Sequence, residues 1–135
     1  MHEIQPSLSD SLVSACRTAV GDSLRTVIWF TPDAFEVLYV RSDIGDAASV
    51  ARRKEQFVES ERAGFGESYR RDTIDAGEEP GLGDYEVTVR VFSDGFLSRV
   101  IVGEQGVLLT TDGLDVDVME ELSVTLRRLL ADVSE

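Results

Sequence analysis

Two arginines, Arg90 and Arg99, are the side chains whose type and spacing most clearly indicate a role in binding or ion pairing. They lie in adjoining apolar stretches, 85–92 and 96–102, and the intervening Asp94-Gly95 suits a two-residue type I′ hairpin turn. That turn predicts a register with Arg90 directly opposite Arg99, where like charges destabilise a hairpin unless an anion lies between them. We expect an intramolecular carboxylate there, with a bound anion or a partner's carboxylate as the alternative. Neither arginine is expected to be catalytic.

A second cationic feature is the stretch 52–71, which holds six Lys or Arg against four Glu, a net charge of +2 that leaves the rest of the chain at −15. Glu and Arg at helical spacing favour a solvated helix face. The alternative is a docking surface for an acidic partner or for a second copy of this chain. The candidate contacts for a partner or an anion are therefore Arg52, Arg53, Arg90 and Arg99.

The other reactive side chains do not combine into a catalytic or metal-binding pattern. The single histidine, His2, lies near the N-terminus, and the single cysteine, Cys16, has the spacing of a buried helix position. Carboxylates gather between residues 112 and 121, but they fail the calcium-loop template and suit a helix N-terminus. The sequence predicts no catalytic residue, no metal site and no cofactor. A small enzyme would have to use carboxylates with Arg90 or Arg99.

The charge composition indicates the solvent and limits the partners. The chain has 26 Asp and Glu against 13 Lys and Arg, a net charge of −13, and Lys54 is the one lysine. So acidic a surface repels itself at low ionic strength, and concentrated salt screens that repulsion. The same charge disfavours binding to nucleic acid. Residues 1–14 lack a signal-peptide pattern and no stretch has membrane-spanning length, so we expect a cytoplasmic protein of a salt-loving organism.

The apolar periodicity predicts the elements that position these side chains. Helices are expected at 8–20, at 46–62 and from residue 117 onward, and strands at 26–30, 35–41, 85–92, 96–102 and 107–111. The unbroken apolar run 26–30 is typical of a strand buried on both faces. Residues 74–84 combine acidic side chains with glycines and predict a mobile acidic loop. With 135 residues, 42% of them apolar, we expect one α+β domain over residues 1–135 with the order α-β-β-α-β-β-β-α.

The ends of the helices carry recognisable signals. Ser7 or Ser9 is expected to cap the first helix, and Gly21 to end it in a left-handed conformation. The last helix is expected to open at Asp117, since Glu120 follows three residues later as in a capping box. Trp29 lies inside the buried run and is interpreted as a core residue.

The order of elements resembles the Roadblock/LC7 family and, more loosely, the profilin-like group that includes GAF and PAS sensor domains. This resemblance implies a five-stranded antiparallel sheet with the middle helix on one side and the two terminal helices on the other. It also implies dimerisation through the middle helix and the adjoining edge strand, and a role as a scaffold or regulator, often of small GTPases. The chain is also similar to an uncharacterised family of small haloarchaeal proteins in residues 12–17 (LVSACR), 20–25 (VGDSLR), 57–62 (FVESER) and 95–101 (GFLSRVI).

These observations favour a non-enzymatic protein-interaction or regulatory module of a halophilic cytoplasm, a homodimeric scaffold for a protein partner that the sequence does not name. The alternative is a sensor domain of GAF/PAS type that encloses a small ligand. The two differ in the space between sheet and helix. A scaffold fills that space with side chains, whereas a sensor leaves a lined pocket.

Overall fold

The computed structural model describes residues 4–52, 55, 58–59, 61–62 and 86–134. Its elements are α1 (Pro6–Val20), the short 3-10 helix η1 (Gly21–Ser23), β1 (Leu24–Phe30), β2 (Phe35–Val40), β3 (Thr88–Phe92), β4 (Gly95–Val102), β5 (Gln105–Thr111) and α3 (Val116–Ser134). Between β2 and β3, residues 47–52, 55, 58–59 and 61–62 are helical and form what we call the middle helix. The predicted α+β class and element order are confirmed. The predicted loop at 74–84 and Arg53 lie outside the described residues.

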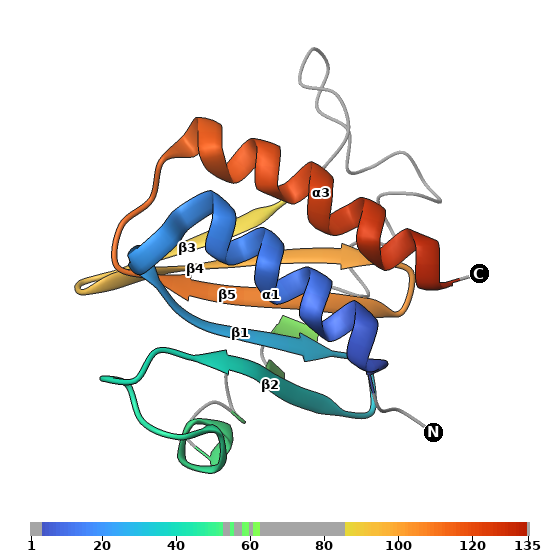
Figure 1. Cartoon of the computed structure of the whole chain (residues 1–135), viewed down its shortest axis with the longest axis horizontal. Helices are drawn as coiled ribbons and strands as arrows, with labels where there is room; N and C mark the ends of the chain where they lie inside the picture. The colour runs from blue at the N-terminus through green and yellow to red at the C-terminus, as the bar shows by residue number, and fades with distance from the viewer. Residues whose placement is uncertain (1–3, 53–54, 56–57, 60, 63–85, 135) are drawn as a thin grey trace.

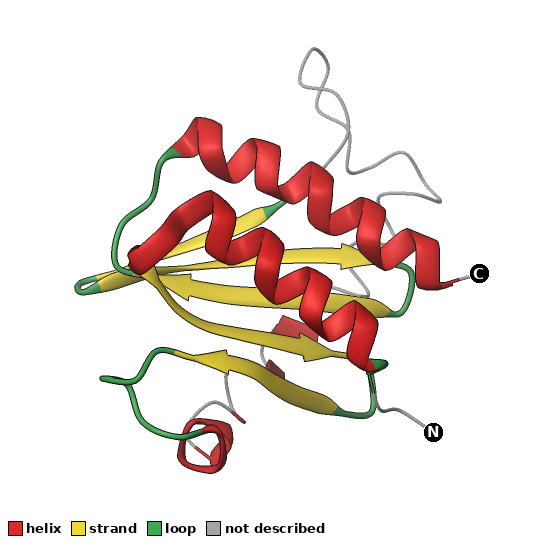
Figure 2. Ribbon diagram, viewed as in Figure 1, coloured by secondary structure: helices red, strands yellow, loops and turns green. Residues whose placement is uncertain are grey.

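The five strands form one antiparallel sheet in the order β2-β1-β5-β4-β3, seen as a single layer in Figure 2. Helices α1 and α3 lie side by side across one face (Figure 1), and their Leu12 and Leu126 join a core cluster with Trp29 of the sheet. On the opposite face, Val58 of the middle helix packs with Ile28 and Phe30. The two terminal helices and the middle helix therefore cover opposite faces, as the Roadblock resemblance implied.

Strand β1 is an interior strand, as its unbroken apolar run predicts. It pairs with β2 on one side and β5 on the other, and six of its seven residues are buried. Trp29 is a core residue, and its Nε1–H donates a hydrogen bond to Gln105 Oε1 at 3.0 Å. Opposite Phe30 lies Gly106, where an added Cβ would lie 2.5 Å from the Phe30 ring. Only glycine at this position lets the aromatic ring lie across β5.

The predicted register of the β3–β4 hairpin is wrong. The two turn residues are Ser93 and Asp94, and Gly95 is the first residue of β4, paired with Phe92. Arg90 is consequently opposite Leu97, while Arg99 is opposite Thr88. The reason is a contact with a third strand, since a Cβ at Gly95 would lie 2.8 Å from the Thr111 carbonyl oxygen of β5. Glycine is therefore required at position 95 by the close approach of β4 to β5, and not by the conformation of the turn.

Both predicted N-terminal helix caps are also wrong. Helix α1 begins at Pro6 with Gln5 in the N-cap position and no capping side chain, so neither Ser7 nor Ser9 caps it. Proline suits the first turn because the N–H that it lacks would have no partner within the helix. Helix α3 begins at Val116, and the Asp115 carboxylate accepts a hydrogen bond from the Val118 N–H at 3.1 Å. Asp115 therefore caps α3 in place of Asp117.

Candidate functional site

A buried cluster of two arginines and one glutamate joins the middle helix to the sheet. Glu61, on the middle helix, is fully buried, and its Oε1 accepts a hydrogen bond from Arg99 Nη1 of β4 at 3.0 Å. Its Oε2 accepts a second hydrogen bond, from Arg90 Nε of β3, at 2.5 Å. The intramolecular carboxylate expected beside the two arginines is therefore present. It holds two neighbouring strands and a helix together.

The two arginines differ in their access to solvent. The Arg99 side chain is 2% exposed, and its Nη2 donates to Thr88 Oγ1 at 2.8 Å. A charge buried to that extent is tolerated only when it is paired and hydrogen-bonded. The Arg90 side chain is 47% exposed on the edge strand. Arg99 is therefore a structural residue, and Arg90 is the member of the cluster that a partner can reach.

The sequence analysis placed a carboxylate near Arg90 and Arg99 but did not identify Glu61. Helical spacing could have placed Glu61 on the inward face of the middle helix, because it lies three residues after Val58, which is buried on that face. Arg52 is an exposed residue near the start of that helix. The ion pairs of the described residues do not join it to the cluster.

The outer strand β3 exposes apolar side chains on both of its faces. Among the described residues β3 pairs with β4 alone, and its exposed fractions are 36% for Val89, 72% for Val91 and 44% for Phe92. An edge strand has unpaired N–H and C=O groups and is a template for pairing with another strand. Exposed apolar side chains along such an edge are typical of a protein-interaction surface.

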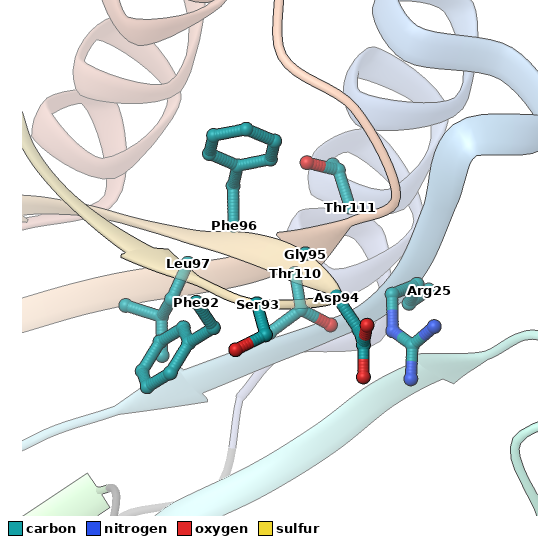
Figure 3. A pocket seen from close by; sticks show the side chains of 9 residues that line it. All are labelled: Arg25, Phe92, Ser93, Asp94, Gly95, Phe96, Leu97, Thr110 and Thr111. Carbon is teal, nitrogen blue, oxygen red and sulfur yellow. The ribbon is translucent and has the colours of Figure 1, made fainter.

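An open groove of about 340 Å³ lies next to the β3–β4 turn. Figure 3 shows Phe92, Leu97 and Arg25 pointing to one side of the sheet, and Phe96 and Thr111 pointing to the other. The groove lies at the end of the exposed edge, on the side that carries Phe92. The space between sheet and helices is filled by the side chains of the two core clusters. This filling does not favour the sensor alternative.

The comparisons with known proteins give a family and a fold. Residues 10–131 match the model of a family described as "Domain of unknown function (DUF7522)". The chain belongs to this family. The structure is similar to that of Myxococcus xanthus MglB, with a TM-score of 0.55 and 11% sequence identity over 98% of this chain and 96% of that chain. This likeness supports the Roadblock/LC7 fold. No curated protein matches the sequence.

A second charged group of this DUF7522 protein lies at the surface, where β1 begins and β2 and β5 end. Arg41 contacts Asp43 and Asp112 at 2.6 Å each, and Arg25 Nη1 lies 3.1 Å from Asp112 Oδ1. Hydrogen bonds from Arg41 hold the pKa of Asp43 and of Asp112 below the ordinary value. The carboxylates that gather in the sequence between residues 112 and 121 therefore have different roles. Asp112 forms ion pairs with Arg25 and Arg41, whereas Asp115 caps α3. Within the described ranges, no group of three or more His, Cys, Asp or Glu is arranged to hold a metal ion.

Arg41→Gln should lower the urea midpoint of unfolding at pH 7, and the difference from wild type should shrink as the pH falls below 3.8. That is the ordinary pKa of the aspartates, which the folded protein holds lower. The unfolded chain then takes up protons first, so the ion pairs stabilise the fold above that pH and lose their effect below it. Arg52→Gln removes an exposed cation and is the matched control. A difference that is equal at pH 7 and at about pH 3 would contradict this origin of the effect.

Two further features complete the description of the DUF7522 fold. Cys16 is fully buried in α1, as its spacing predicted, and burial raises the pKa of its thiol to about 12. A thiol in that state is not a nucleophile at neutral pH. Of the helices in the described part of the chain, none has both the length and the apolar character that crossing a membrane requires.

Proposed function

We propose that this protein is a non-enzymatic interaction or regulatory module that acts as a homodimeric scaffold. The observation that carries the proposal is the outer strand β3, which among the described residues pairs with β4 alone and exposes the side chains of Val89 and Val91 on one face and of Phe92 on the other. Contact with a second protein surface would remove these apolar side chains from water.

The arginine cluster supports a binding role rather than a chemical one. Glu61 accepts hydrogen bonds from both Arg90 and Arg99, and Arg99 is 2% exposed. These hydrogen bonds fix the position of β3 against the middle helix. A stiff edge strand loses little conformational entropy when a partner binds, which favours recognition.

We also propose a halophilic cytoplasm as the setting. The supporting observation is the net charge of −13 with a single lysine among 13 cations. Two copies with this charge repel each other at low ionic strength, and salt at molar concentration shortens the screening length to about 3 Å. Dimerisation is therefore expected to strengthen with KCl concentration. The contacts of the described residues do not identify the protein partner that the scaffold would bind.

The test is the molar mass by light scattering after size exclusion in concentrated KCl, for wild type and two glutamate variants. Val91 on β3 is 72% exposed and Val116 at the start of α3 is 73% exposed, so they form a matched pair. Val91→Glu places a carboxylate on the proposed edge and should weaken the dimer by on the order of a hundredfold, a hot-spot-sized effect. Val116→Glu should leave the dimer intact. A wild type that stays monomeric, or a Val91→Glu variant that stays dimeric, would overturn the proposal.

A further inference from the structure

We infer that the outer edge of strand β2 binds a short, extended and cationic segment of the protein partner, which pairs with β2 as an added strand. The inference rests on the proposed interaction role, to which it adds the binding site and the chemistry of the partner. Strand β2 lies at the opposite edge of the sheet from β3. A segment bound there therefore leaves the apolar surface of β3 uncovered.

An open groove of about 250 Å³ lies along this edge. Its lining comes from residues 37–40 of β2 and from Gly45, Asp46 and Ala47. Gly45 has a positive φ of 137°, which residues with side chains rarely adopt, and it leads the chain into the middle helix. Figure 1 shows that helix beginning beyond β2, on the side away from β1. The groove is therefore bounded by the edge of a strand and by the start of a helix.

Backbone groups of β2 point into this edge. Directly before β2, the Ala34 carbonyl accepts a hydrogen bond from the Thr31 N–H at 2.9 Å, and directly after it the Arg41 N–H donates to a carbonyl of β1 at 2.8 Å. Residues of an antiparallel strand alternate between facing the paired strand and facing away from it. Counted inward from these two ends, Val37 and Val40 direct their N–H and C=O groups away from β1. Among the described residues β2 pairs with β1 alone, so these groups are available to an extended chain.

A β-bulge limits how much of β2 can pair with another strand. Tyr39 is opposite Val27 and Val37 is opposite Ile28, so Leu38 is an extra residue on the β2 side. A bulge increases the local twist and interrupts regular pairing along an edge. The edge therefore suits a short segment that contacts Val37 and Val40, and it does not suit a long regular strand.

The charge around the groove favours a cationic segment. Of the described residues that line it, Asp46 alone is charged, and its Oδ1 accepts a hydrogen bond from the Ser49 N–H at 2.8 Å. Asp46 is exposed, so its carboxylate can accept a further hydrogen bond from a Lys or Arg side chain. The net charge of −13 attracts a basic segment and repels a second copy of this chain. The occupant is therefore a different protein with a basic, extended segment.

Binding of a defined peptide tests the site. The probe is a labelled hexapeptide of alternating valine and lysine, because valine favours a strand and lysine supplies positive charge. In concentrated KCl the full chain should bind this peptide, as measured by fluorescence anisotropy. The corresponding peptide of valine and glutamate should bind more weakly, because it meets Asp46 with like charge.

Hydrogen exchange locates the bound peptide. In the complex the exchange of the Val37 and Val40 amides should slow by on the order of tenfold or more, because peptide carbonyls then accept hydrogen bonds from them. The Arg41 amide already donates to β1 and should change little.

Two tryptophan variants form a matched pair. Ala47 lines the groove, whereas the neighbouring Ala48 is exposed and is not among the described residues of the lining. Ala47→Trp should weaken peptide binding by more than about tenfold, because the indole ring fills the groove. Ala48→Trp should leave the affinity unchanged.

An asparagine at position 46 tests the role of charge. Asp46→Asn keeps a side chain that can cap the helix and removes the negative charge, so it should weaken binding of the lysine peptide by about three- to fivefold. Asp94→Asn, at the exposed turn between β3 and β4, is the control and should bind like wild type.

The contradicting outcomes are distinct from a failure of the homodimer. Absence of peptide binding, binding without protection of Val37 and Val40, or an equal loss in the two tryptophan variants overturns β2 as the site. Equal affinity for the lysine and glutamate peptides overturns the cationic partner. A monomeric wild type that binds the peptide along β2 overturns the homodimer alone, and a dimer that does not bind it overturns this inference alone.

Discussion

Glu61→Gln is expected to lower the free energy of unfolding by about 3–5 kcal/mol, the cost of leaving a buried charge without its partner. Glutamine has nearly the same shape as glutamate, so the change removes charge and little else. Arg99, 2% exposed, would keep its guanidinium charge in the buried site without the Glu61 carboxylate. Arg90 loses less, because its side chain is 47% exposed and water can solvate it. Urea unfolding in concentrated KCl, followed by circular dichroism, measures the difference.

Glu59→Gln is the matched control for this change. Glu59 lies on the same helix and forms an ion pair with Arg62, but its side chain is 64% exposed. Exposed ion pairs contribute about 0–1 kcal/mol, so the control variant should remain close to wild type. An equal loss in the two variants would show that the burial of Glu61 does not matter.

A double variant separates charge from packing. Glu61→Leu with Arg99→Met replaces the buried pair by apolar side chains of similar volume, and such replacements are often neutral or stabilising. We expect the double variant to recover most of the stability that Glu61→Gln loses. If it is as unstable as the single variant, the cluster contributes through something other than the pairing of its charges.

Leu126→Ala is expected to lower the free energy of unfolding by about 2–5 kcal/mol. Leu126 is fully buried in α3 and belongs to the core cluster that holds α1 and α3 against the sheet. Truncation removes buried apolar surface and leaves a cavity that helices packed on a sheet close only in part. The same urea titration in concentrated KCl measures the loss.

Val116→Ala on the same helix provides the comparison for Leu126→Ala. Val116 is 73% exposed, so its truncation removes almost no buried surface and should change the free energy of unfolding by less than about 0.5 kcal/mol. If both alanine variants lose the same stability, helix propensity rather than core packing is the cause, and the role assigned to the α1 and α3 layer is wrong.

The arginine cluster also connects stability to the proposed interface. Arg90 lies on β3, and its Nε donates to a carboxylate of the middle helix. Removing that carboxylate should therefore weaken the dimer as well as the fold, because the edge strand loses the contact that fixes its position. If Glu61→Gln, under conditions in which it is fully folded, keeps the dimer affinity of wild type, the cluster stabilises the fold without supporting the interface.

Local spacing in the sequence determined the order and type of the elements. Apolar residues three and four apart place Leu12 and Cys16 on one face of α1, and the unbroken run ending at Phe30 predicts an interior strand. These patterns depend on neighbours within a few residues, so they can be read from the sequence alone. The need for glycine at the end of α1 follows the same rule, since Gly21 has a positive φ of 59°, although its ψ of −137° is not that of the left-handed helical conformation that the sequence predicts.

Tertiary structure alone decided the register of β3 against β4 and the partner of each arginine. The turn residues Asp94-Gly95 favour one register, yet the observed one differs because Gly95 lies against Thr111 of a third strand. Glu61 is separated from Arg90 by 29 residues and from Arg99 by 38. Helical spacing assigns Glu61 to the inward face, but only the packing of that helix on the sheet selects the guanidinium groups that it meets. Contacts between residues far apart in the chain depend on how the layers fit together, which no local pattern encodes.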